Sequence, residues 1–317
     1  MSFKDSKIAI IGTGNVGSTT AYTIINQGLC EDLVLIDMNK EKAMGEAIDM
    51  KHAIHFMNRN MRVRVGDYSE CSDADIIIIT ASAPMDKDAT NRLDMLAPSK
   101  KVMKSIITPI MESGFAGTII VVSNPVDIMT YYAWKLSGLP ENHVIGSGTT
   151  LDTARLCCEI GDIFDLDSKS VSAYIIGEHG DSETVSWNSA TVGGKSLTDV
   201  MKDNSERTKE VTFDQLRKDT IDAGWQIFRR KGNTCYGIAA STCAIAKSIL
   251  LNENRILPVS VHLTGQYGLN DIYLSVPTIL GKDGAKEIVE IKLTNEEQKA
   301  LEASAKVIRS FYDALEL

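Results

Sequence analysis

The feature of this sequence that most constrains its fold is a series of short apolar runs with no polar alternation. One run, at residues 75–80, contains four consecutive isoleucines, and similar runs occupy residues 7–11, 32–36 and 117–123. A strand buried on both faces shows such a continuous pattern, because neither of its faces meets water. Segments with helical spacing separate the runs. This alternation predicts an α/β fold built on a doubly wound parallel sheet.

The second half of the chain has a different pattern, with a long helix expected from residue 151 and later runs typical of antiparallel strands. Glycine and serine at residues 146–148 interrupt the earlier alternation and mark the expected boundary. We therefore predict a first domain at residues 1–146 and a mixed α+β domain with antiparallel strands at 147–317. Further expected elements are a helix at 98–113, strands at 170–176 and 287–293, and a closing helix at 295–317.

A glycine pattern, Gly12-x-Gly14-x-x-Gly17, directly follows the first predicted strand and opens the first helix. The first glycine permits a tight turn, the second lets a pyrophosphate approach the main chain, and the third lets helix pack on strand. At the start of the helix, Asn15 and Val16 add N–H groups that point toward such a phosphate. This context predicts a dinucleotide-binding Rossmann domain.

An acidic residue, Asp37, ends the second predicted strand twenty residues after Gly17. A carboxylate at this place accepts hydrogen bonds from a ribose diol and repels a 2′-phosphate. The predicted cofactor is therefore NAD rather than NADP.

Composition excludes several classes of protein. The net charge of −9 argues against nucleic-acid binding, which depends on neutralising phosphates. Six cysteines without a C-x-x-C pair are expected to be reduced thiols, which indicates a reducing compartment. No apolar signal segment opens the chain, and no apolar run is long enough to span a bilayer. We expect a soluble cytoplasmic protein with no nucleic-acid or membrane partner.

One of the five histidines has a distinctive setting. His179 follows a predicted strand and lies between two glycines, so its imidazole is expected in an open loop, where function and turn chemistry are equally good explanations. His52 and His55 share a polar helix face with no third histidine nearby, and we expect no metal there. His143 and His262 fall at or inside predicted strands and are treated as structural.

Asp152 and Arg155 are three residues apart at the start of a predicted helix and so share one face. Two interpretations remain open for this pair. It is either a surface ion pair at a helix start, or an acid that orients a histidine beside an arginine that binds a carboxylate. A second pair, Tyr131 and Lys135, mimics the site of short-chain dehydrogenases, but its glycine and serine context does not fit and we interpret it as a helix face.

The chain resembles the lactate/malate dehydrogenase family, and within it the lactate branch, over nearly its whole length. The resemblance depends on motifs that are highly specific in combination. They are the glycine pattern at 12–17, Ser123-Asn124-Pro125-Val126-Asp127, the segment from Gly146 to Arg155, Gly177-Glu178-His179-Gly180-Asp181-Ser182, and Gly265-Gln266-Tyr267-Gly268.

The resemblance implies a role for each matching residue in reducing a 2-oxo acid. His179 is the implied proton donor and acceptor, Asp152 orients it, and Arg155 binds the substrate carboxylate. Arg92, on a mobile loop at residues 81–94, polarises the substrate carbonyl. Histidine suits the proton transfer because its pKa lies near working pH, and arginine matches a carboxylate bidentately.

Three further residues gain roles from the same resemblance. Asn124 is implied to contact substrate or nicotinamide, Ser147 to support the nicotinamide end of the cofactor, and Thr234 to line the substrate pocket. Relatives are homotetramers or homodimers, so a homo-oligomer is expected.

The specificity loop departs from the family pattern, being one residue longer than usual. Counting from either end places Met85 or Asp86 at the position that selects the substrate, where the lactate branch has glutamine and malate enzymes have arginine. Pyruvate and L-lactate are the expected substrates. The alternative is an L-2-hydroxyacid dehydrogenase that prefers larger 2-oxo acids such as 2-oxoisocaproate, since one methylene changes binding by only about 1–3 kcal/mol. Malate dehydrogenase and a non-catalytic NAD-binding protein fit less well.

A second departure concerns regulation. Bacterial relatives that respond to fructose 1,6-bisphosphate carry an arginine and a histidine where this chain has Cys157 and Ser172. Without those cations a bisphosphate lacks its main partners. We therefore expect no activation by fructose 1,6-bisphosphate.

Overall fold

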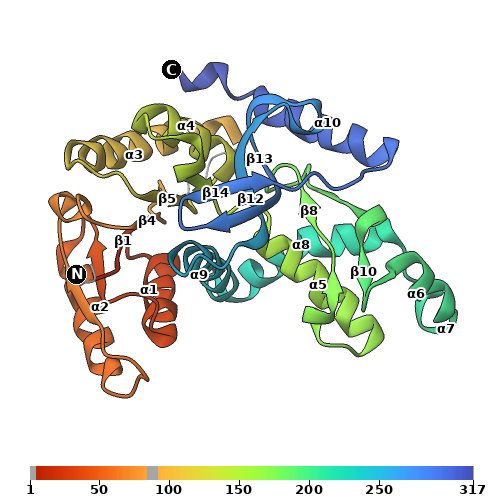
Figure 1. Ribbon diagram of the computed structural model, residues 1–317, viewed down its shortest axis with the longest axis horizontal. Coiled ribbons are helices and arrows are strands. Elements are labelled where there is room, and N and C mark those ends of the chain that lie inside the picture. Colours follow the sequence, from red (N-terminus) through yellow and green to blue (C-terminus); the bar gives the residue numbers. More distant parts are fainter. Residues whose placement is uncertain (1–4, 84–91, 317) are drawn as a thin grey trace.

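The computed structural model describes residues 5–83 and 92–316, and within these ranges all side chains except those of residues 92–95. Its centre is a nine-stranded sheet with the order β14-β13-β12-β6-β5-β4-β1-β2-β3. Helices cover both faces of the parallel part, and a second group of elements from the middle of the chain lies to one side (Figure 1). No helix within the described ranges is both long and apolar enough to cross a membrane.

The first half forms six parallel strands in the order 6-5-4-1-2-3, which confirms the predicted doubly wound Rossmann sheet. The strands are β1 (Lys7–Ile11), β2 (Asp32–Ile36), β3 (Arg62–Val65), β4 (Ile76–Ile79), β5 (Thr118–Val121) and β6 (Val144–Gly146). The connecting helices are α1 (Asn15–Gln27), α2 (Lys40–Ile54), α3 (Arg92–Glu112) and α4 (Val126–Ser137).

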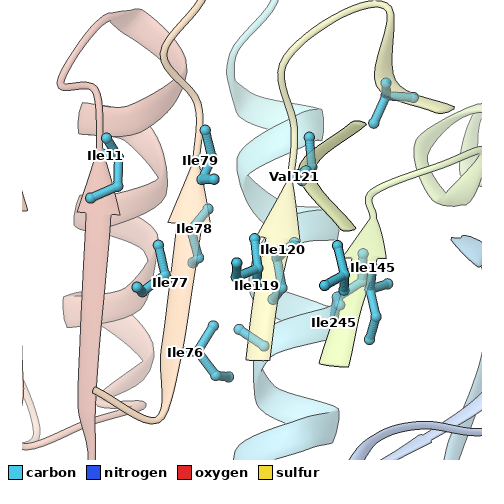
Figure 2. Packing of buried hydrophobic residues seen from close by; sticks show 14 of the residues in the cluster. Ile11, Ile76, Ile77, Ile78, Ile79, Ile119, Ile120, Val121, Ile145 and Ile245 are labelled. Atoms are coloured by element: carbon cyan, nitrogen blue, oxygen red, sulfur yellow. The ribbon is translucent and has the colours of Figure 1, made fainter. Parts of the chain in front are cut away.

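The core lies on both faces of this sheet. All four isoleucines of β4 are fully buried, and Ile119, Ile120 and Val121 of β5 pack beside them (Figure 2). Since β-branched side chains fill a strand that is covered on both faces, the isoleucine run is explained by its central position.

The helix α3 begins at residue 92, six residues before the predicted start at Pro98. Leu96, on the N-terminal side of the proline, is buried on the same helical face as Met103 and Ile110, seven and fourteen residues on. This packing continues across Pro98, whose missing N–H removes only one helical hydrogen bond. The expected start was wrong because the burial of Leu96 stabilises the helix on the N-terminal side of Pro98.

The second half contributes the helices α5 (Thr150–Phe164), α8 (Phe213–Lys231), α9 (Tyr236–Leu250) and α10 (Asn295–Arg309). Its long antiparallel strands are β12 (Arg255–Thr264), β13 (Asn270–Gly281) and β14 (Gly284–Ile288). Ser260 of β12 pairs with Gly146 of β6, so these strands extend the parallel sheet. The sequence predicts antiparallel strands, but it does not predict that they join the first sheet.

Three predicted elements of the second half differ in the structure. The expected strand at 170–176 is two short strands, β7 (Val171–Ser172) and β8 (Ile175–Ile176), in different small sheets. The strand expected at 287–293 is β14, which begins at Gly284 and ends at Ile288. Gly284 has φ +85°, so the turn before it places the strand start earlier than the apolar pattern indicates. The closing helix α10 ends at Arg309, followed by a short 3₁₀ turn.

The partners of β7 and β8 are short strands that no local pattern indicates. Strand β9 (Thr184–Val185) pairs with β8. Strand β10 (Thr191–Val192) pairs with β7 and with β11 (Lys195–Ser196). The polar stretch after residue 200 contains the short helices α6 (Leu197–Asp203) and α7 (Ser205–Thr208). Two-residue strands are selected by their tertiary partners, so the sequence pattern predicts one strand where the structure has two.

Candidate active site

The glycine turn after β1 has the close approaches that its sequence predicts. Gly12 has φ +98°, and a Cβ there would lie 2.7 Å from the main-chain nitrogen of Ala81. A Cβ on Gly17 would lie 1.8 Å from the carbonyl oxygen of Gly12, so any larger residue would force helix and strand apart. The space around Gly14 is open, with no atom within 4 Å of its Cβ position. The main chain at Gly14 is therefore free to meet a ligand.

Asp37, just after β2, is tied to the same turn. Its Oδ2 accepts hydrogen bonds from the main-chain N–H of Thr13 (2.6 Å) and from the Thr13 hydroxyl (3.0 Å), and Oδ1 accepts from the N–H of Asn39 (2.8 Å). Partial burial opposes the charged form, but these hydrogen bonds keep the pKa of Asp37 below its usual range. The sequence predicts an acidic residue here but does not predict its hydrogen bonds with Thr13.

These residues fit a dinucleotide. Within the described residues no side chain caps the start of α1, and Gly14 and Asn15 are exposed there, with Val16 half-buried behind them. Free N–H groups at a helix start attract phosphate, and the charged Asp37 suits an unphosphorylated ribose.

Two of the predicted catalytic residues, His179 and Asp152, meet at the start of α5 together with Arg155, which was predicted to bind the substrate. The Nδ1–H of His179 donates to Oδ2 of Asp152 over 2.6 Å, and Nη1 of Arg155 donates to Oδ1 of the same carboxylate over 2.7 Å. The side chain of Asp152 is 4% exposed, against 28% for His179 and 16% for Arg155. Because a carboxylate only accepts, the proton is on Nδ1 and the other ring nitrogen remains for a substrate oxygen.

Hydrogen bonds between threonine hydroxyls and the main chain hold α5, which carries Asp152 and Arg155, against β8, which precedes His179. The Thr149 hydroxyl donates to the carbonyl of Ile175 (2.6 Å), and the N–H of Ile175 donates to the Thr153 hydroxyl (2.9 Å). These contacts fix α5 against β8, and His179 follows β8 after two residues. The position of the imidazole relative to Asp152 is thus set by the main chain.

A further acid, Asp127, holds the main chain of His179. This residue lies in the first turn of α4, and its Oδ2 accepts the N–H of His179 at 2.8 Å while Oδ1 accepts the Ser275 hydroxyl at 3.3 Å. Burial raises the pKa of Asp127. The sequence shows this residue only as part of a motif and does not identify His179 as its partner.

The electrostatics favour a charged imidazole. The Asp152 carboxylate raises the pKa of His179 to about 9, against the opposing effect of burial. The pKa of Asp152 itself is lowered, because His179 and Arg155 outweigh its burial. The three groups therefore form an anion held between two cations at neutral pH.

The guanidinium of Arg155 lies beside a glycine of the neighbouring helix. A Cβ on Gly224 of α8 would lie 3.4 Å from Nη2 of Arg155. The guanidinium therefore lies against a residue without a side chain, and a larger residue at this position would crowd it.

The remaining predicted residues differ in how far the structure describes them. Asn124 lies close to Ala81 and Ser123 beyond the carboxyl ends of β4 and β5, and the Ser123 hydroxyl donates to the Ala81 carbonyl at 2.6 Å. Ser147 is buried and donates its N–H to the Val121 carbonyl at 2.8 Å. Thr234 is half-buried between α8 and α9.

The residues of the specificity loop, Met85 and Asp86, lie outside the described residues, as does most of the predicted loop at 81–94. The main chain of Arg92 begins α3, and its side chain is likewise outside them.

Two of the other histidines, His262 and His143, have structural surroundings. Both ring nitrogens of His262 lie within hydrogen-bond distance of carboxylate oxygens, those of Glu141 (2.6 Å) and Asp271 (3.1 Å), and the ring packs against that of Trp134. The Nδ1 of His143 contacts the carbonyl of Gly117 at 3.1 Å.

Comparison with known proteins identifies the family of this chain. A family model described as lactate/malate dehydrogenase, NAD binding domain, matches residues 6–146, and one described as the alpha/beta C-terminal domain matches residues 149–315. L-lactate dehydrogenase 3 of Bacillus thuringiensis subsp. konkukian is 48% identical over 305 residues, and L-lactate dehydrogenase 2 of Bacillus cereus is 44% identical over 304. Each alignment covers 96% of both chains.

Solved structures show the same likeness. The minor L-lactate dehydrogenase of Enterococcus mundtii, with ligands bound, superposes with a TM-score of 0.94 at 41% identity over 98% of both chains. A lactate dehydrogenase from a Medee basin deep-sea metagenome gives a TM-score of 0.94 at 42% identity, covering 99% of this chain and 100% of that one.

The Rossmann sheet with its glycine turn, the match to a dehydrogenase NAD-binding domain and the named relatives together define an NAD-dependent oxidoreductase. The chain belongs to the lactate/malate dehydrogenase family. The resemblance drawn from its motifs is thereby confirmed.

Proposed function

We propose that this protein is an L-lactate dehydrogenase, which reversibly reduces pyruvate to L-lactate with NAD as its cofactor. The observation that carries the proposal is the contact of His179, Asp152 and Arg155 through a single carboxylate. This arrangement supplies a proton donor and a carboxylate-binding cation on the same side of one helix start. The named relatives are L-lactate dehydrogenases, which supports pyruvate as the oxo acid.

In the proposed mechanism each residue has one task. NADH, when bound, supplies the hydride that reaches the substrate carbon. His179 gives its proton to the carbonyl oxygen and takes it back in the reverse reaction, while Asp152 stabilises the imidazolium. Arg155 holds the substrate carboxylate with the part of its guanidinium that Asp152 leaves free. We assign to Arg92 the polarisation of the substrate carbonyl.

The cofactor and pocket residues are proposed on the same basis. Gly12, Gly14 and Gly17 form the pyrophosphate turn, with Asn15 and Val16 opening the helix, and Asp37 binds the ribose. Asn124 and Ser147 serve the nicotinamide end. Thr234, Met85 and Asp86 border the substrate. We place the domain boundary between residues 146 and 147, with NAD in the first domain and substrate residues mainly in the second.

The substrate is tested by following NADH oxidation with pyruvate, 2-oxoisocaproate and oxaloacetate, compared as kcat/KM. Pyruvate is expected to give the highest value. Oxaloacetate should be poor, because burying its second carboxylate without a cation costs several kcal/mol. A higher value for 2-oxoisocaproate or for oxaloacetate would contradict the proposal.

The pH dependence should follow the imidazole. Reduction of pyruvate needs protonated His179, whose pKa is about 9, so kcat/KM is expected to stay level through neutral pH and to fall above about 9. Oxidation of lactate needs the neutral ring and should rise over the same range. Steady-state kinetics in both directions measure the two profiles. A reduction rate that falls below pH 7 would count against His179 as the proton donor.

We also propose a homo-oligomer in the cytoplasm. Met44 and Ile48 of α2 and Tyr22 of α1 are each about half exposed, which suits a subunit contact on these helices. The six cysteines, all within the described residues, are free thiols, as expected in a reducing compartment. Light scattering coupled to gel filtration would measure the oligomer, and a monomer would contradict this part.

A further inference from the structure

A carboxyl group beside the catalytic pair has no role in the mechanism above. Glu183 lies immediately before β9 and is 2% exposed. Its Oε1 is buried and has no hydrogen-bond partner among the described residues. One oxygen of Glu183, one of Asp152 and one ring nitrogen of His179 all lie within 4.8 Å of one another. A buried carboxylate oxygen without a hydrogen-bond partner disfavours the charged form, so the charge state of Glu183 depends on these neighbours.

The groups that surround Glu183 come from three elements. Asp152 of α5 and His179 of the loop after β8 lie beside it, and the charge of Arg155 on α5 also acts on it. Arg217 of α8 lies close by and donates from Nε to the main-chain carbonyl of Glu183 at 2.8 Å. Asp152 therefore opposes a charge on Glu183, whereas the three possible cations favour one.

The same three atoms have the ligand types of a metal site, but a proton fits the geometry better. The 2.6 Å contact between His179 and Asp152 already holds a proton. The Arg155 guanidinium bonds the other oxygen of Asp152, so a divalent cation would face a fixed positive charge.

We propose that Glu183 is a positioning residue for the catalytic proton: its isolated carboxyl, once ionised, adds a second negative charge beside His179 and keeps the imidazole protonated to a higher pH than Asp152 alone. This inference rests on the proposed function of His179. It assigns to Glu183 an electrostatic task, with no contact to substrate.

The order of ionisation supports this task. Burial, followed by the charge of Asp152, raises the pKa of Glu183 to about 8. The pKa of His179 is about 9, with Asp152 as its main cause and with Glu183 and Asp127 as lesser ones. As pH rises, Glu183 loses its proton first, and its new charge then opposes loss of the proton from His179.

The test compares the wild type with Glu183→Gln, which keeps the shape and removes the charge. In apo protein with ¹⁵N-labelled histidine, NMR titration gives the pKa of His179, whose signal is assigned by its absence in His179→Asn. We expect Glu183→Gln to lower this pKa by about one unit. The alkaline fall of kcat/KM for pyruvate should move to lower pH by the same amount. Glu159→Gln, a half-buried carboxyl one turn after Arg155 on α5, is the control for general loss of charge and should move neither value.

An unmoved His179 titration in folded Glu183→Gln would overturn the inference, while turnover of pyruvate by the wild type would leave the proposed function standing. An inactive wild type would instead contradict the function. If Glu183→Gln does not fold, infrared difference spectra of the wild type with ¹³C-labelled glutamate decide. A protonated glutamate carbonyl band that disappears near pH 8 is expected, and its absence at neutral pH would contradict the inference.

Discussion

Replacing His179 by asparagine is expected to lower kcat for pyruvate reduction by about 10³-fold and to leave NADH binding unchanged. The asparagine amide can still donate a hydrogen bond to Asp152, but it has no acidic proton that it can transfer to the substrate oxygen. The loop should keep its shape, because Asp127 holds the main-chain N–H of residue 179 at 2.8 Å and not the imidazole. Steady-state kinetics and the fluorescence of bound NADH measure the two quantities.

The matched control is His262→Asn. This histidine also bonds two carboxylates, those of Glu141 and Asp271, but it lies on β12 away from the catalytic group. Its replacement should lower the melting temperature and leave kcat near the wild-type value. Loss of NADH binding in His179→Asn, or turnover close to that of the wild type, would contradict the role assigned to His179.

The parallel half of the fold could be predicted from the sequence because its signal is local. The bounds of β1 and β2 agree with the predicted runs, since every residue of these two strands is buried and such a strand is mostly apolar. Pairings between distant segments have no such signal. The junction of Ser260 with Gly146, which joins the two halves into one sheet, spans more than a hundred residues.

The site shows the same division. His179, Asp152 and Arg155 are identified by their motifs, and the structure brings all three into contact. Asp127 and Glu183 are missed because their importance depends on which group of the folded chain lies beside them. One signal was available for Asp127: an acid directly between Val126 and Ile128 at a buried helix start needs a partner. For Glu183 no comparable pattern exists.

Arg155→Lys should have the second large effect, and mainly on substrate binding. The guanidinium bonds Asp152 through Nη1 at 2.7 Å and has further N–H groups in the same plane for a substrate carboxylate. The lysine side chain is shorter and ends in a compact ammonium group. It cannot contact both Asp152 and the substrate carboxylate in this geometry. We expect KM for pyruvate to rise about 100-fold, which corresponds to about 2.7 kcal/mol, with a smaller fall in kcat.

The control for this substitution is Arg207→Lys. Arg207 of α7 donates to the carbonyl of Phe164, at the far end of the same helix α5, so its replacement perturbs that helix without touching the catalytic group. Its KM should stay at the wild-type value. An Arg155→Lys enzyme with an unchanged KM and a much lower kcat would require a different role for this arginine. The guanidinium would then act on charge that develops during the reaction, and the carboxylate of the substrate would need another cation.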